Sequence, residues 1–198
     1  MKKILLLGSL LLAVSATSTA ATLTFEGQNN TTYTSSIERD GFRIGNSSGQ
    51  EQHFHEIDST QYGLTSNGTG VLLNDRDTNI FVESAVGSVF SLTSVDVAAS
   101  LSNYPASSIV IEGFLGGLSV GTISAIFSSN FITLSGASLG NLDKLVFDGI
   151  GLEGGFELDN LVLGPAVSAV PIPAAAFLFA PALLGFMGLR RKAKNTVA

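Results

Sequence analysis

Apolar and polar residues alternate in short runs along the middle of the chain, and Gly, Asn, Ser or Asp separates one run from the next. Alternation with a period of two is typical of a β-strand with one buried face, and hardly any run places apolar residues at helical spacing. Many short strands without helices favour an all-β fold, a β-sandwich of two sheets. The predicted strands are 22–26, 41–45, 70–74, 79–83, 89–99, 108–115, 121–127, 131–135, 144–150 and 155–163.

Two of these strands change the phase of their alternation. The change in 89–99 predicts either a bulge at 93–94 or a turn onto the second sheet. The change in 155–163 falls at Asp159 and Asn160. A carboxylate at a bulge can leave the sheet to bind a ligand, or it can serve as an edge charge that opposes aggregation, and the pattern leaves both readings open.

The first twenty residues form a charged start, an apolar stretch and a small-residue cleavage site. This is the pattern of a secretory signal peptide, so 1–20 is predicted to be removed on export. Cleavage after Ala20 is predicted, with Ala21 as the alternative.

The other end of the chain is apolar from 170 to 189, and a helix of these 20 residues would be about 30 Å long, the thickness of a bilayer core. Two early prolines keep the start extended, so the predicted transmembrane helix is 174–189. The sandwich is then expected at 21–164 and a proline-containing linker at 165–173. The basic tail 190–198 holds the C-terminus in the cytoplasm. Its membrane-stop residues are Arg190, Arg191, Lys192 and Lys194.

Charge and cysteine content limit the chemistry of the exported part, 21–169. It carries four basic against sixteen acidic residues, a formal charge of −12. Nucleic acid is therefore not expected as a partner, whereas a bound cation or solubility through charge is. The chain has no cysteine, so disulfides and thiolate metal sites are excluded.

No catalytic residue is predicted. The pattern Gly-x-Ser-x-Gly surrounds Ser119 and Ser138, but both histidines precede these serines, whereas a hydrolase of this class needs Asp and His after the nucleophile. The sixteen carboxylates could form acid pairs whose separation the sequence does not give, so a secreted hydrolase stays as an alternative.

His53 and His55 are the only histidines, and on a strand they would point to one face, as a metal-binding pair does. The surrounding residues favour an exposed polar loop instead.

The segment 75–80 places oxygen ligands at every second residue, as a calcium loop does. Ile80 stands where such a loop needs Gly, so we predict a polar hairpin turn that links strands 70–74 and 79–83.

Aromatic platforms for sugars are few. The chain has no Trp, and most of its Phe residues alternate as core positions. Tyr33, Tyr62 and Tyr104 fall in predicted loops, where they are expected to be rim residues rather than ligand platforms.

The stretch GGFELDNLVL at 154–163 resembles the final strand of the jelly-roll domains used as carbohydrate-binding modules. In that family an acidic residue of the last strand and a Glu of the first strand hold a structural calcium ion. The resemblance implies Asp159 and Glu26 as ligands lying close together, with Asn160 replacing the second acid of the family. Calcium takes six to eight oxygen ligands, so main-chain carbonyls and further carboxylates would complete the site.

The C-terminal order of a proline motif, a short apolar helix and a basic cluster resembles the PEP-CTERM sorting signal of bacteria, in its Val-Pro-x-Pro-Ala variant. The matching residues are Val170, Pro171, Pro173 and Ala174, and Ile172 replaces the Glu of the main family. The resemblance implies a Gram-negative bacterium, a transient anchor in the inner membrane facing the periplasm, and an exosortase that moves the protein to the surface or matrix. It also implies an association with exopolysaccharide.

The sequence therefore favours an exported surface or matrix protein with a non-catalytic jelly-roll domain that binds polysaccharide. A purely structural or adhesive protein without sugar affinity comes second, and a secreted polysaccharide hydrolase third.

Overall fold

The structure is a computed structural model, and it describes residues 20–26, 31–33, 35–47, 54–60, 64–75, 78–101, 104–128 and 130–165. The chain divides into two units, Met1–Ala166 and Val167–Ala198. All described residues belong to the first unit. The predicted signal peptide up to residue 19, the sorting motif, the membrane helix and the basic tail lie outside the described residues. Within the described ranges, no helix is long and apolar enough to cross a membrane.

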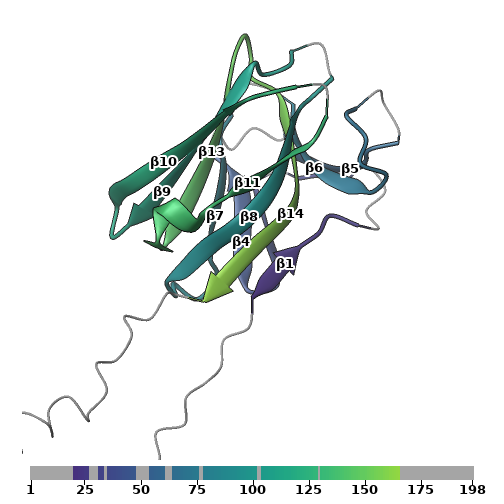
Figure 1. The fold of residues 1–198 in the computed structure, drawn as a ribbon. Coiled ribbons are helices and arrows are strands. Elements are labelled where there is room, and N and C mark those ends of the chain that lie inside the picture. Colours follow the sequence, from purple (N-terminus) through teal and green to yellow (C-terminus); the bar gives the residue numbers. More distant parts are fainter. Residues whose placement is uncertain are drawn as a thin grey trace, which may run out of the picture. The chain divides into compact units, whose positions relative to one another are not determined.

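Two antiparallel sheets make up the first unit (Figure 1). Sheet A has the order β11-β8-β14-β6-β5-β2, with β1 on β14 and β12 on β8, and sheet B has the order β10-β9-β13-β7-β4-β3. The strands of sheet A are β1 (Ala21–Leu23), β2 (Thr31–Thr32), β5 (Phe54–Asp58), β6 (Gly70–Asn74), β8 (Phe90–Ala99), β11 (Ile132–Ser135), β12 (Asn141–Leu142) and β14 (Phe156–Pro165). The strands of sheet B are β3 (Ser36–Arg39), β4 (Phe42–Asn46), β7 (Ile80–Ser84), β9 (Ser108–Leu115), β10 (Leu118–Ile126) and β13 (Lys144–Ile150). A 3-10 turn, η1 (Ala137–Leu139), follows β11.

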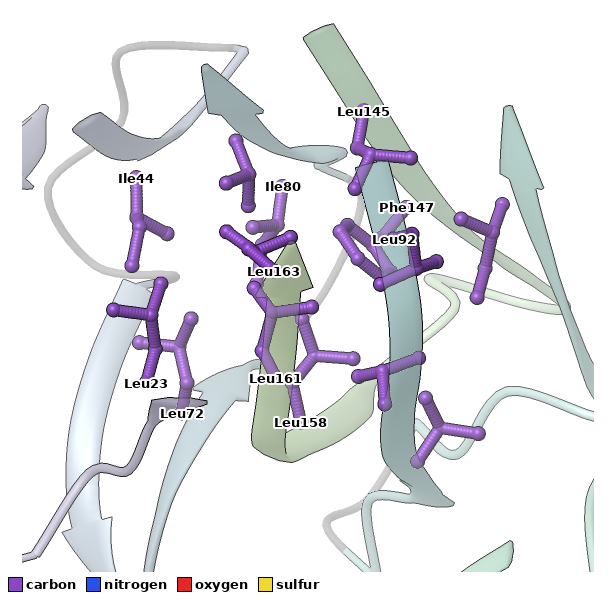
Figure 2. Packing of buried hydrophobic residues seen from close by; sticks show 14 of the residues in the cluster. Leu23, Ile44, Leu72, Ile80, Leu92, Leu145, Phe147, Leu158, Leu161 and Leu163 are labelled. Carbon is purple, nitrogen blue, oxygen red and sulfur yellow. The ribbon is translucent and has the colours of Figure 1, made fainter. Parts of the chain in front are cut away.

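One hydrophobic core fills the space between the sheets. Leu158, Leu161 and Leu163 of β14 point from sheet A into the cluster that holds Ile44 and Ile80 of sheet B (Figure 2). All five side chains are at most 1% exposed. Each such side chain stabilises the fold by about 1.5–3 kcal/mol relative to an exposed one, so the core alone can hold a chain without disulfides.

The prediction of an all-β sandwich is confirmed. Each of the ten predicted strands is present, and those at Gly70–Asn74, Ser108–Leu115 and Lys144–Ile150 have the predicted bounds. The chain alternates between the two sheets, which is the arrangement of a jelly roll. The sequence pattern missed four strands. Strands β2 and β12 are only two residues long, and strands β3 and β5 contain charged residues.

Strand β5 corrects the prediction of an exposed polar loop around the histidines. Phe54 and Glu56 of this strand are fully buried. The carboxylate of Glu56 is compensated by Arg39, whose Nη1 lies 2.7 Å from Oε1 and whose Nη2 donates to Oε2 at 3.0 Å. The Tyr33 hydroxyl also donates to Oε2, at 2.8 Å. A buried charge is tolerated when it is paired and hydrogen-bonded, and here it gives a core strand a polar sequence.

The predicted hairpin between strands β6 and β7 is wrong. The polar segment between them joins different sheets, because β6 pairs with β5 and β14 whereas β7 pairs with β4 and β13. Asn74 and Thr78 are buried at this crossing, and the Asn74 side-chain amide donates to the Thr78 carbonyl at 2.6 Å. This hydrogen bond joins the end of β6 in sheet A to the residues that lead into β7 in sheet B.

Both predicted phase changes are bulges in the pairing of β14 with β8. Asp159 is opposite Asp96, Val162 is opposite Ser94, and the next residue of β14 is opposite Leu92. One extra residue therefore lies in each strand. Asn160 has a φ of 45°, the left-handed conformation that Asn tolerates better than most residues. This bulge lets Asp159 and Asn160 leave the regular alternation of the strand.

Candidate functional site

The part of the outer face of sheet A around β6 is covered by the chain that precedes this strand. Leu64 and Thr65 of this segment are 7% and 4% exposed. Leu64 packs with Val71 and Leu73 in a second small apolar cluster, against which Ile57 also lies. This part of sheet A is therefore not available to a large ligand.

The outer face of sheet B carries the side chains that alternate with the core positions of its strands. Ile80 and Val82 of β7 are fully buried, whereas Phe81 and Glu83, which alternate with them, are partly exposed. Strands β9 and β13 repeat this alternation, whereas Ile44, Gly45 and Asn46 of β4 are all buried. Among the described residues, no segment packs over this face as Leu64 and Thr65 do over sheet A. We call its central residues the Phe81 face; they are Arg43, Phe81, Glu83, Glu112, Phe114 and Lys144.

The ring of Phe81 has room to lie over strand β4 because its neighbour on that strand is a glycine. Gly45 is the register partner of Phe81, and a Cβ added to Gly45 would stand 2.8 Å from Cζ of the ring. The ring therefore lies over the backbone of β4. Two cations from the flanking strands complete its surroundings: the guanidinium carbon of Arg43 is 5.4 Å, and Nζ of Lys144 is 5.2 Å, from the ring centroid.

Charged side chains alternate in sign next to the ring. Lys144, Glu83 and Arg43 are successive register partners across β13, β7 and β4. Nε of Arg43 donates to Oε1 of Glu83 at 2.7 Å. The face thus offers a flat apolar surface, several N–H donors and carboxylate acceptors within one small area. This combination can hold a ring-shaped polyhydroxylated ligand, with an apolar ring face on Phe81 and hydroxyl groups on the charges.

Sequence reasoning missed this site because it assigned most Phe residues to the core. A signal was present, since Phe81 has the opposite parity to the apolar residues on either side of it in β7. The tyrosines, by contrast, do not form a platform. Tyr33 packs on the core, and burial together with its hydrogen bond to Glu56 raises its pKa to about 12. Tyr104 lies between β8 and β9, and Tyr62 lies outside the described residues.

His55 lies on β5, where its Nδ1 is 3.0 Å from the Thr32 hydroxyl of β2. His53 lies outside the described residues. A His-x-His metal pair is therefore not described here.

The two predicted calcium ligands, Glu26 and Asp159, meet around residues 67–70. The amide of Gly70 donates to Oε2 of Glu26 at 3.3 Å. The preceding residue, Thr69, donates from its hydroxyl to Oδ2 of Asp159 at 3.1 Å, and Asn67 donates to the same oxygen at 2.6 Å. Asp159 also accepts the Asn160 amide on Oδ1, at 2.7 Å. The loop thus ties β1 to the bulge of β14.

Burial and a nearby carboxylate both disfavour the charged form of Asp159. Burial raises the pKa of Asp159, the surrounding donors oppose the rise, and the nearby charge of Glu26 adds to it. Among the described residues, no three His, Asp or Glu side chains gather closely enough to hold a metal by themselves. An ion at this point would need main-chain carbonyls or water in addition to the two carboxylates.

Glu157 is the other buried acid of β14 and lies under the same covering segment. The Thr65 amide donates to its Oε1 at 3.2 Å, whereas the buried Oε2 has no hydrogen-bond partner. Burial raises the pKa of this carboxyl group to about 8. The side chain is therefore largely protonated at neutral pH, and it is the most strongly perturbed acid described.

A cavity of about 440 Å³ opens at the end of the sandwich where β1 begins and β14 ends. Its lining includes Ala20, Asp40, Phe42, Phe90 and Pro165. The two phenyl rings pack edge to face, with centroids 5.3 Å apart, so neither offers the open stacking surface that Phe81 provides.

No family model matches this chain, and no curated protein matches it. Solved structures similar to it include the family 32 carbohydrate-binding module of C. perfringens NanJ in complex with galactose, at 11% identity and a TM-score of 0.40 over 65% of this chain and 97% of that chain. The K1 cleaved adhesin domain of Lys-gingipain from Porphyromonas gingivalis W83 is 12% identical, with a TM-score of 0.45 over 74% and 98%. A family 29 carbohydrate-binding module from Piromyces equi is 12% identical, with a TM-score of 0.40 over 75% and 93%.

Proposed function

We propose that this chain is an exported cell-surface or matrix protein whose non-catalytic sandwich binds polysaccharide on the Phe81 face. The observation that carries the proposal is the Phe81 ring on the uncovered side of sheet B, with Arg43 and Lys144 at 5.4 Å and 5.2 Å from its centroid. A rigid sheet supports the ring from below, so binding costs little ordering of the protein.

The distribution of charge supports this choice of surface. The exported part has only four basic residues, and two of them, Arg43 and Lys144, flank Phe81. A third, Arg39, is paired with the buried Glu56. The Phe81 face is thus a local concentration of N–H donors on an acidic domain, suited to the hydroxyl or acidic groups of a polysaccharide.

Replacing Phe81 by Leu should weaken binding to polysaccharide about tenfold or more, because the site loses its flat stacking surface while keeping an apolar side chain over Gly45. Affinity electrophoresis of the purified chain against a panel of soluble polysaccharides measures this change. Phe81→Tyr keeps the ring and should bind like the parent chain. Phe131→Leu, at a partly buried position that packs against the Leu64 cluster, is the matched control.

Retardation that is equal for the parent chain and Phe81→Leu would reject the Phe81 face as the site. If no polysaccharide retards the parent chain, the structural or adhesive alternative replaces the binding function. Release of shorter sugars by the purified chain would instead support the hydrolase alternative.

We also propose that the tail acts as an exosortase sorting signal. The proposal rests on the order of the Val170, Pro171, Pro173 and Ala174 motif, the apolar stretch and the cations that follow. In this scheme the inner membrane holds the protein only until the sorting enzyme cuts near the motif. An acidic sandwich with a separate apolar tail suits this route, because the domain stays in water while the tail seeks lipid.

We further propose that a calcium ion stabilises the network of Glu26 and Asp159, because two neighbouring carboxylates repel each other and a divalent cation removes that repulsion. Excess EDTA should then lower the melting temperature of the parent chain by several degrees, and added calcium should restore it. Glu26→Gln should respond to neither, since it lacks one carboxylate. A melt of the parent chain that EDTA leaves unchanged would contradict the calcium proposal without affecting the Phe81 face.

A further inference from the structure

Strand β10 forms one edge of sheet B and pairs only with β9 (Figure 1). It is nine residues long, Leu118–Ile126, and the backbone N–H and C=O groups on its outer side face no described strand. Such an edge is a template for a strand from another chain.

This edge has few of the devices that usually prevent strand addition. The 30 residues from 113 to 142, which contain β10, β11 and β12, include no charged residue. Two large apolar side chains of β10 are strongly exposed, Leu118 at 74% and Ile126 at 83%. A bulge falls between Ser119 and Gly121, but the strand beyond it is regular. The opposite edge of the same sheet, β3, is only four residues long and carries Glu38 and Arg39.

Charge indicates which partner this edge suits. The exported part has a formal charge of −12, from four basic and sixteen acidic residues, so two copies repel each other when charged sides meet. The uncharged edge is the side on which that repulsion is weakest. A cationic partner would be attracted more strongly by the acidic surfaces elsewhere on the domain. A partner that is itself acidic meets the least electrostatic repulsion at this edge. Another copy of this chain is such a partner.

We propose that two copies of this chain pair through β10, antiparallel, about a twofold axis at Ser124. In this register Thr122 lies opposite Ile126 of the second copy, which covers an exposed apolar side chain. Ile123 then lies opposite Ala125 of the second copy. Both of these residues already pack against the core, so the pairing joins the two cores at their edges. Because the contact uses the same edge of both copies, it closes as a dimer.

A single introduced cysteine tests the pairing, because the natural chain has none. In the purified full-length chain, Ser124→Cys should form a disulfide-linked dimer under mild oxidation, since directly opposed Cβ atoms in an antiparallel pair are about 4.5–5.5 Å apart. Glu38→Cys, on the same outer face at the opposite edge, is the control and should remain mostly monomeric. Non-reducing gel electrophoresis reads both.

Charge variants of the Ser124→Cys chain test the register. Thr122→Lys with Ile126→Lys places like charges opposite each other twice and should remove most of the cross-linked dimer. Thr122→Lys with Ile126→Asp places opposite charges in the same two positions and should retain it. Within one copy the two positions are about 13 Å apart, so both variants disturb the monomer similarly.

A dimer yield at Ser124→Cys no greater than at Glu38→Cys would overturn the proposal. Equal yields from the two charge variants would overturn it as well, because a contact elsewhere on the molecule would not distinguish them. Neither outcome depends on whether the Phe81 face binds polysaccharide.

Discussion

The free energy of unfolding of the sandwich is expected to fall as the pH rises from about 5 to about 8, because of Glu157. Burial raises the pKa of this carboxyl group from 4.5 to about 8 in the folded chain. Below pH 4.5 both states carry the proton. Between pH 4.5 and about 8 only the folded state carries the proton, so the free energy of unfolding falls by about 1 kcal/mol for each pH unit. Guanidinium unfolding of the purified chain at a series of pH values measures this slope.

Replacing Glu157 by Gln should flatten the slope and raise the free energy of unfolding at pH 8 by about 1–3 kcal/mol, because the amide keeps an acceptor for the Thr65 N–H and needs no buried charge. Glu38→Gln removes the same charge from an exposed position and serves as the control. All three proteins are compared at high salt, which screens the repulsion among the exposed acidic residues of the domain. If the slope of Glu157→Gln equals that of the parent chain, Glu157 does not hold its proton at neutral pH.

Deleting 170–198 is expected to abolish retention in the cell envelope and to release the sandwich as a soluble exported protein. The deletion removes the apolar stretch and the four following cations but leaves β14, which ends at Pro165, intact. Fractionation of cells into periplasm, membranes and medium, with detection of the sandwich, measures the change.

A second variant separates membrane retention from sorting. Replacing Pro171 and Pro173 by Ala keeps the apolar stretch and the cations, so the protein should accumulate in the inner membrane and fail to reach the surface. Unchanged fractionation of the deletion variant would show that the tail is not the anchor. Normal surface delivery of the proline variant would show that the motif is not the signal.

Local pattern predicted most strands of this fold because their alternation is regular and ends at turn residues. Strands β6, β9 and β13 have the bounds expected from the sequence. Strand β5 was not predicted, because the charged residue Glu56 occupies a core position and its partner Arg39 lies on another strand. The crossing after β6 resembles a hairpin in the sequence because a polar turn does not reveal whether the next strand joins the same sheet.

The Phe81 face on sheet B was harder to predict than the bulge in β14 of sheet A. The phase change at Asp159 and Asn160 is a property of one strand, so the sequence contains it. The Phe81 face depends on Gly45 below the ring and on cations from two flanking strands. Those residues meet only after the sheet has formed, and no local rule connects them.

The position of β14 has a mechanical consequence for the membrane tether proposed above. This strand is flanked by β8 along one side and by β6 and β1 along the other, and the sequence of the proposed tether follows its last residue, Pro165. Hydrogen bonds in an antiparallel sheet run across the strands, so tension drawn along β14 loads them in shear and together. Force applied through the tether would thus have to slide a central strand out from between its neighbours. An edge strand, by contrast, could be peeled away one hydrogen bond at a time.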